Sequence, residues 1–152
     1  MPRRRGRDPR ILGWSRGDAW LRVQHMHRMS PGSPEEIHAL IAAALDSGDL
    51  DAFVALHEEG ATTLVPPDGR PVSGREAIRA ALEPMFALRP SARIEVVGKL
   101  EADGLALTHA RLNVVAGDGA ERLDISGHGT IVSRRQPDGS WRIVLDNPMT
   151  PA

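Results

Sequence analysis

The chain has 152 residues, a length typical of one domain, and it contains no cysteine. Disulfide bonds, thiolate catalysis and cysteine-bound zinc are therefore excluded. The net charge is −1, but it is spread unevenly: residues 1–30 hold eight arginines against two aspartates, and residues 31–152 hold eleven basic against eighteen acidic groups. The acidic body argues against nucleic acid as a partner of the folded part.

Residues 1–30 join a basic cluster to one apolar run, residues 11–21, which Arg16 and Asp18 interrupt. The run resembles neither a signal peptide nor a membrane span, and we expect a cytoplasmic protein with no membrane partner. Two interpretations of the segment stay open: a basic arm for nucleic acid or anionic lipid, and a disordered tail. We predict the tail, followed by one domain at residues 31–150, because the segment shows no periodicity that would fit a partner.

Two helices are expected at the start of the domain. Ser33 to Glu36 is a capping box with proline at the first helical position, and apolar residues follow at helical spacing up to Gly48. Asp49 caps a shorter helix that ends at Gly60 and carries His57 on its apolar stripe. A histidine there is either a core residue or a group that binds ligand or transfers a proton.

A hairpin, a third helix and a strand should follow. Residues 61–65 and 70–72 flank a Pro-Pro-Asp-Gly turn and should pair. Ser73 to Glu76 is a second capping box, and Pro84 should kink or end the helix that it opens. Residues 93–101 alternate as a strand, and the turn after Ala102 leads into a meander at residues 105–147.

Two turns fix the expected register of that meander. Asp118-Gly119 is a strong hairpin signal, and the turn at residues 136–139 has proline and glycine where a three-residue loop needs them. The first turn predicts three opposed pairs: His109 with His128, Arg111 with Ser126, and Asn113 with Asp124. The second predicts Thr130 opposite Asp146 and Val132 opposite Val144.

These registers gather polar side chains on one face of the sheet, with His128 on the diagonal from Asp146. We predict a polar pocket in which Asp146 and His128 are the catalytic residues. The candidate ligand-binding residues are His57, His109, Arg111, Asn113, Ser126, Thr130 and Val144.

The outer strand decides which face the helices cover. If Ala102 opposes Leu105, then the charged residues of strand 93–101 accompany the apolar face of the meander, and a charged edge belongs on the outside of a sheet. We therefore expect the helices over the polar face and an exposed apolar face that forms a homodimer contact. The residues of that expected contact are Leu112, Ile125, Ile131, Ile143 and Leu145.

The order of these elements, with the Gly74-Arg75-Glu76 helix start and a meander closing on Trp141-Arg142-Ile143, resembles the nuclear-transport-factor-2-like superfamily. Within it, residues 33–148 are most similar to the SnoaL-like group, which includes polyketide cyclases and has the steroid isomerases as relatives. The resemblance implies an α+β fold: a cone-shaped, curved, mostly antiparallel sheet wrapped around three helices, a cystatin-like α+β barrel. It also implies a ligand cavity on the helix side and usually a homodimer through the outer sheet face.

The catalytic residues of the steroid isomerases do not carry over. Their tyrosine and two aspartates fall at Ile41, Val65 and either His128 or Thr130 of this chain. SnoaL-type cyclases use an acidic residue in the cavity, and the resemblance gives this role to Asp146.

Two classes of function remain open. In the first, acid–base chemistry without a cofactor acts on a small carbonyl or polyketide-like compound, by cyclisation, isomerisation, dehydration or hydrolysis. In the second, a dimeric pocket protein sequesters a small ligand or serves as an association module without turnover. Two other roles of Asp146 stay open. It could form a metal site with His109 and His128, for which no fourth ligand is evident, or a purely structural hydrogen-bond network with Thr130 and both histidines.

Overall fold

The computed structural model describes residues 30–150, so the predicted tail lies outside the described residues. Within them, three α-helices and a 3₁₀ turn accompany one six-stranded sheet. The helices are α2 (Pro34–Ser47), α3 (Leu50–Ala55), α4 (Arg75–Ala87) and the 3₁₀ turn η1 (Gly119–Glu121). The strands are β1 (His57–Val65), β2 (Arg70–Ser73), β3 (Ser91–Ala102), β4 (Leu105–Ala116), β5 (Leu123–Arg135) and β6 (Trp141–Thr150).

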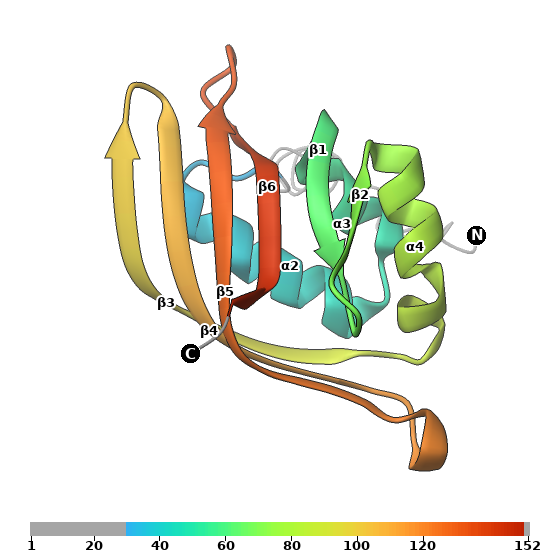
Figure 1. Cartoon of the computed structure of the whole chain (residues 1–152). Coiled ribbons are helices and arrows are strands. Elements are labelled where there is room, and N and C mark those ends of the chain that lie inside the picture. Colours follow the sequence, from blue (N-terminus) through green and yellow to red (C-terminus); the bar gives the residue numbers. More distant parts are fainter. Residues whose placement is uncertain (1–29, 151–152) are drawn as a thin grey trace, which may run out of the picture.

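The strands lie in the order β2-β1-β6-β5-β4-β3. Only the contact of β1 with β6 is parallel, and the others are antiparallel. The sheet is curved, α2 lies along one face against β3, β4 and β6, and β4 and β5 extend beyond β6 as a long hairpin that ends in η1 (Figure 1). The predicted α+β fold with a curved, mostly antiparallel sheet is confirmed. No helix in this part of the chain is long and apolar enough to cross a bilayer.

Helix α2 begins and ends where its caps predict. The Ser33 hydroxyl accepts a hydrogen bond from the backbone N–H of Glu36 at 3.2 Å, and Gly48 ends the helix with a φ of 68°. A positive φ at this position costs glycine little, because glycine has no Cβ. One side of the helix is buried against the sheet, and its members are Pro34, Ile37, His38, Ile41, Ala44 and Leu45.

The other two helices differ from the predictions. Helix α3 ends at Ala55, so His57 begins strand β1 and does not lie on a helix. Helix α4 starts after Gly74 without a side-chain cap, and it continues past Pro84 to Ala87. Packing explains this continuation: Phe86 is buried and its ring meets that of Phe53 edge-on at 5.6 Å, which holds the last turn despite the hydrogen bond that proline removes.

The hairpin of β4 and β5 is longer at its tip than the Asp118-Gly119 signal predicts. The 3₁₀ turn η1 uses residues that a two-residue loop would have paired, so Arg111 lies opposite His128 and Asn113 lies opposite Ser126. The predicted register is therefore wrong by two residues. Because side chains alternate with a period of two, this shift leaves every residue on its predicted face.

A one-residue β-bulge at Val144, by contrast, moves the side chains that follow it to the face opposite the predicted one. Near the turn the predicted pairing holds, with Arg135 opposite Trp141. Beyond Val144 the register moves by one, and Asp146 lies opposite Ile131, whereas Thr130 lies opposite Asn147. The predicted facing of Thr130 and Asp146 is wrong, because an odd shift turns the following side chains to the other face.

A second bulge, at Val97, explains why the helices cover the face of the sheet opposite to the predicted one. Lys99 lies opposite Thr108 as predicted, but beyond Val97 the pairing changes and Ile94 lies opposite Leu112. Ile94 therefore shares the apolar face of β4, and this is the face that the helices cover. The expected helix layer over the polar face is wrong. Of the expected dimer contact, only Leu145 points outward, whereas Ile131 and Ile143 are buried and Leu112 and Ile125 line a cavity under the helices.

Candidate functional site

The cavity lies between the helices and the apolar face of the sheet. Its walls are mainly apolar side chains, contributed by both the helices and the strands, among them Ile41, Phe53, Leu82, Ile94, Leu112 and Ile131. The space open to the centre of a water-sized sphere is about 70 Å³, so the cavity is narrow. Three polar side chains also line it: His38, Thr63 and Asp146. Apolar walls with a few polar groups are typical of a small-molecule site.

Asp146 enters the cavity from β6, next to the bulge at Val144. The residue as a whole is partly exposed, but its carboxyl group is surrounded by protein atoms. The immediate surroundings of the carboxyl group determine the cost of its ionisation. Burial raises the pKa of Asp146 from 3.8 to about 7. No side chain or backbone group among the described residues forms a hydrogen bond or ion pair with this carboxyl group.

The strand registers place Asp146 in a row of side chains that crosses the sheet beneath the helices. Thr63 of β1 lies on one side of Asp146, and Ile131 of β5 lies on the other. Thr108 of β4 lies opposite Ile131 and continues the row. Neighbouring strands are about 4.8 Å apart, so the backbones of Asp146 and Thr108 are separated by about 10 Å. In this row the apolar side chain of Ile131 therefore separates two polar parts, Thr63 with Asp146 on one side and Thr108 on the other.

His38 reaches the Thr108 end of this row from helix α2. Its Nε2 and the Thr108 hydroxyl are 2.7 Å apart, and the histidine is only 4% exposed. Burial lowers the pKa of His38 to about 4, so the ring is neutral at pH 7. His38 is a site residue that the sequence analysis misses. Its position three residues before Ile41 and seven before Leu45, on the apolar stripe of a well-capped helix, is the signal that could have identified it.

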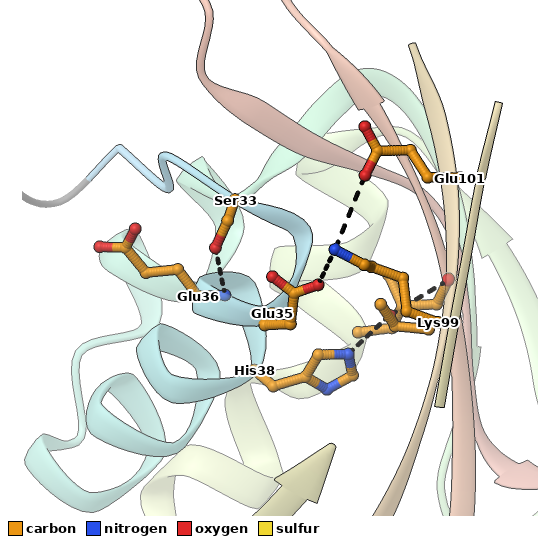
Figure 2. Close-up of polar contacts among 8 residues, drawn as sticks. Ser33, Glu35, Glu36, His38, Lys99 and Glu101 are labelled. Carbon is orange, nitrogen blue, oxygen red and sulfur yellow. Dashed lines mark hydrogen bonds and ion pairs between the residues drawn. The ribbon is translucent and has the colours of Figure 1, made fainter. Parts of the chain in front are cut away.

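An ion pair joins α2 to the edge strand beside His38. Lys99 of β3 lies 2.5 Å from the Glu35 carboxylate and 3.7 Å from that of Glu101 (Figure 2). Glu35 raises the pKa of Lys99, and Lys99 in turn lowers the pKa of Glu35. Both side chains are substantially exposed, so the contact positions the start of α2 more than it stabilises the fold.

Most of the predicted ligand-binding residues lie on the outer face of the sheet, away from the cavity. His109 Nδ1 is 2.9 Å from the Thr130 hydroxyl, and the Asn113 amide donates to Ser126 at 2.6 Å. Arg111 contacts Glu95 at 3.5 Å. The structure thus brings these residues together as expected, but on the face that the helices leave uncovered.

His128 also lies on the outer face, opposite Arg111, whereas Asp146 points into the cavity. The predicted pairing of His128 with Asp146 is wrong, and so are both the structural network and the metal face of His109, His128 and Asp146, because the bulge puts the carboxylate on the other side of the sheet. Within residues 30–150, no group of three or more His, Asp or Glu side chains is placed to hold a metal ion. Val144, the bulge residue, does not line the cavity.

His57 is fully buried beside the cavity wall and does not line the cavity. Its Nδ1 lies 3.0 Å from the Phe53 carbonyl oxygen, and its Nε2 is buried without a partner in the described part of the chain. Burial lowers the pKa of His57 to about 4. Of the two interpretations that the sequence leaves open, the structure matches the core residue with one satisfied nitrogen.

The comparisons with known proteins agree with this architecture. The model of the SnoaL-like domain matches residues 37–144. No curated protein matches the chain.

Three solved structures show the same fold. One is a candidate calcium/calmodulin-dependent protein kinase type II association domain from Thiobacillus denitrificans, with 24% identity over 80% of this chain and 98% of that one, and a TM-score of 0.63. Another is a protein from Novosphingobium aromaticivorans that resembles nuclear transport factor 2 and has a cystatin-like fold, with 19% identity over 90% and 89% of the two chains and a TM-score of 0.62. The third is a ketosteroid isomerase-like protein from Erwinia carotovora atroseptica, with 13% identity over 74% and 89% and a TM-score of 0.64. At these identities the structures support the fold and not a shared activity.

The family match covers most of the described domain, and the capped helices, the closing meander and the cavity under the helices are the features that the sequence resemblance implies. The chain belongs to the SnoaL-like domain family.

Proposed function

We propose that the protein binds a small, largely apolar carbonyl or polyketide-like compound in the cavity and that Asp146 acts on it as a general acid–base catalyst. The observation that carries the proposal is a carboxyl group without a partner among residues 30–150, in mainly apolar surroundings that raise its pKa to about 7. Such a group is present at neutral pH in both its protonated and its ionised form. This is the condition under which one side chain accepts and returns a proton most effectively.

The reaction class follows from what one carboxyl group does without a cofactor. Ionised Asp146 removes a proton from the carbon beside a carbonyl group, and the electron pair of the broken C–H bond moves toward the carbonyl oxygen. The protonated carboxyl group then returns the proton to another carbon, which is an isomerisation, or to a leaving hydroxyl, which is a dehydration. Attack of the same carbanion on a second carbonyl group is a cyclisation, and hydrolysis would use the carboxylate to deprotonate water.

Proton exchange tests this proposal before the substrate is known. In heavy water, the wild-type protein should speed the replacement of the acidic C–H protons of 2-tetralone, followed by proton NMR, and the rate should rise with pH through about 7. Asp146→Asn should lose about 100-fold or more of the added rate, because an amide does not accept the proton. Asp124→Asn removes a carboxylate from the outer face and should keep the rate. Equal rates in the wild type and Asp146→Asn would contradict the assignment of Asp146.

The second candidate function is a dimeric binding or association module without turnover, and the outer face of the sheet favours it. The registers place four apolar side chains next to one another across β3, β4, β5 and β6, in the order Leu100, Leu107, Val132 and Leu145. Leu100 is 72% exposed and Leu145 is 51% exposed. A contiguous apolar row on a solvent-facing sheet favours a contact with a second copy.

Charge substitution tests the dimer. Leu107→Glu combined with Leu145→Glu should convert a wild-type dimer into a monomer in light scattering, because two carboxylates per protomer would be buried in the contact. Ala87→Glu, which adds a charge at the end of α4, is the control. A wild-type monomer would refute the proposal, and a dimer that survives both charges would place the contact elsewhere.

A further inference from the structure

The cavity has a second polar end that the acid–base proposal does not use. His38 and Thr108 are 4% and 0% exposed, and they lie across Ile131 from Asp146. A histidine that lines an apolar cavity, and the buried threonine that it contacts, cost free energy unless their polar atoms find partners. The contact between the two side chains satisfies only one ring nitrogen of His38, Nε2, and leaves Nδ1 without a hydrogen bond from Thr108.

We assign the ring proton of His38 to Nε2. The Thr108 hydroxyl lies 2.7 Å from His38 Nε2 and 3.4 Å from the Ile131 carbonyl oxygen, and that oxygen only accepts, so the arrangement that satisfies both contacts has the hydroxyl donating to Ile131 and accepting from the Nε2–H of His38. A neutral imidazole protonated at Nε2 has an unprotonated Nδ1 that accepts a hydrogen bond. Figure 2 shows this second nitrogen on the side of the ring away from the dashed contact. The described residues provide no donor to it.

We propose that His38, held in place by Thr108, is the second polar contact for the ligand, accepting a hydrogen bond from a ligand hydroxyl at the end of the cavity opposite Asp146. The inference rests on the proposed function and narrows its substrate class. The preferred molecule is a flat, apolar compound of one or two fused rings with an oxygen function at each end. One oxygen function lies near the Asp146 carboxyl group, and the other is a hydroxyl that meets His38. The small volume of the cavity favours a compound of this size.

A pair of probe ligands isolates the second contact. 2-Naphthol carries one hydroxyl group, and naphthalene-2,6-diol carries one at each end of the same ring system. Calorimetric titration of the wild type at neutral pH should show the diol binding about tenfold more tightly, which is the contribution of one added neutral hydrogen bond in an apolar site. In His38→Phe the two probes should bind within about twofold of each other. The comparison of two ligands on one variant cancels any general loss of stability or packing.

Three further variants complete the test. His38→Gln retains an acceptor oxygen and should restore a preference for the diol, which also covers the case in which His38→Phe does not fold. Thr108→Val removes the partner that orients His38 and should weaken the preference. His109→Asn alters the matched His–Thr contact on the outer face and should leave the preference unchanged. A tenfold preference that persists in both His38→Phe and Thr108→Val would overturn the inference.

The result also separates this inference from the proposed function. If both probes bind the wild type without any preference for the diol, His38 is not a ligand contact, and the role of Asp146 is unaffected. If neither probe binds the wild type, both the second contact and the proposed ligand class are refuted.

Discussion

Replacing Asp146 by asparagine should make the folded protein more stable at high pH. The pKa of Asp146 is raised from 3.8 to about 7 by burial, so the folded chain holds this proton more firmly than the unfolded chain does. The stability that results is fully present below pH 3.8 and is lost as the pH rises through about 7. Each tenfold change in acid strength corresponds to about 1.4 kcal/mol, so the ionised carboxylate costs the folded state about 4 kcal/mol at most, and solvent reaching the partly exposed residue lowers this to about 2–4 kcal/mol. The amide of Asp146→Asn has a similar shape and no charge to bury.

Urea denaturation of both proteins between pH 4 and pH 8 measures the effect. The free energy of unfolding of Asp146→Asn minus that of the wild type should increase by about 2–4 kcal/mol across this range. Asp124→Asn is the matched control for net charge, because it removes a carboxylate from the exposed outer face. A difference that stays constant with pH would show that the carboxyl group is not buried in an apolar environment, and the acid–base proposal would lose its main support.

Three other substitutions test separate parts of the structure. Gly129→Ala should destabilise the fold by about 1–3 kcal/mol in thermal or urea unfolding and reduce probe binding. The reason is that the added Cβ would lie 2.8 Å from a Leu112 methyl group at the cavity wall. An unchanged stability would mean that the Leu112 side chain moves aside at little cost. His57→Gln should weaken the loss of unfolding free energy at acid pH. The pKa of His57 is lowered from 6.5 to about 4, so stability that is present above pH 6.5 is lost as the pH falls to about 4, by about 3 kcal/mol at most. An unchanged acid dependence in the variant would refute this. Ser33→Ala should cost about 1 kcal/mol of unfolding free energy by removing the cap of α2, and no loss would show that this hydrogen bond does not stabilise the start of the helix.

Helix ends and turns that depend on a few neighbouring residues could be predicted from the sequence. The start and end of α2 follow from Ser33 and Gly48, and the pairing of Val65 with Arg70 follows from the turn between them. The turn before Ser140 also has the predicted pairing, with the backbone N–H of Gln136 donating to the Ser140 carbonyl oxygen at 2.7 Å. Each of these depends on local backbone preference, and tertiary packing does not override it.

The side of the sheet on which each residue lies could not be predicted in the same way, because it depends on two single-residue bulges. The sequence carries a weak sign of both. Strict alternation fails at Val96-Val97 and again at Ile143-Val144-Leu145, where apolar residues follow one another directly. Such a break is compatible with a bulge, with a strand buried on both faces, or with an exposed apolar residue, and only the pairing partners of the strands decide among these.

Asp146 lies in the cavity because two differences from the predicted structure cancel. The helices cover the face opposite to the expected one, and the bulge at Val144 moves Asp146 to that same face. The pairing of β5 with β4 contains no bulge, so His128 stays on its predicted face and lies outside the cavity. The candidate site therefore depends on the bulge itself. In a strand without the extra residue, Asp146 would lie beside Thr130 on the outer face, and the cavity floor would have His38 and Thr63 as its polar groups but no carboxyl group.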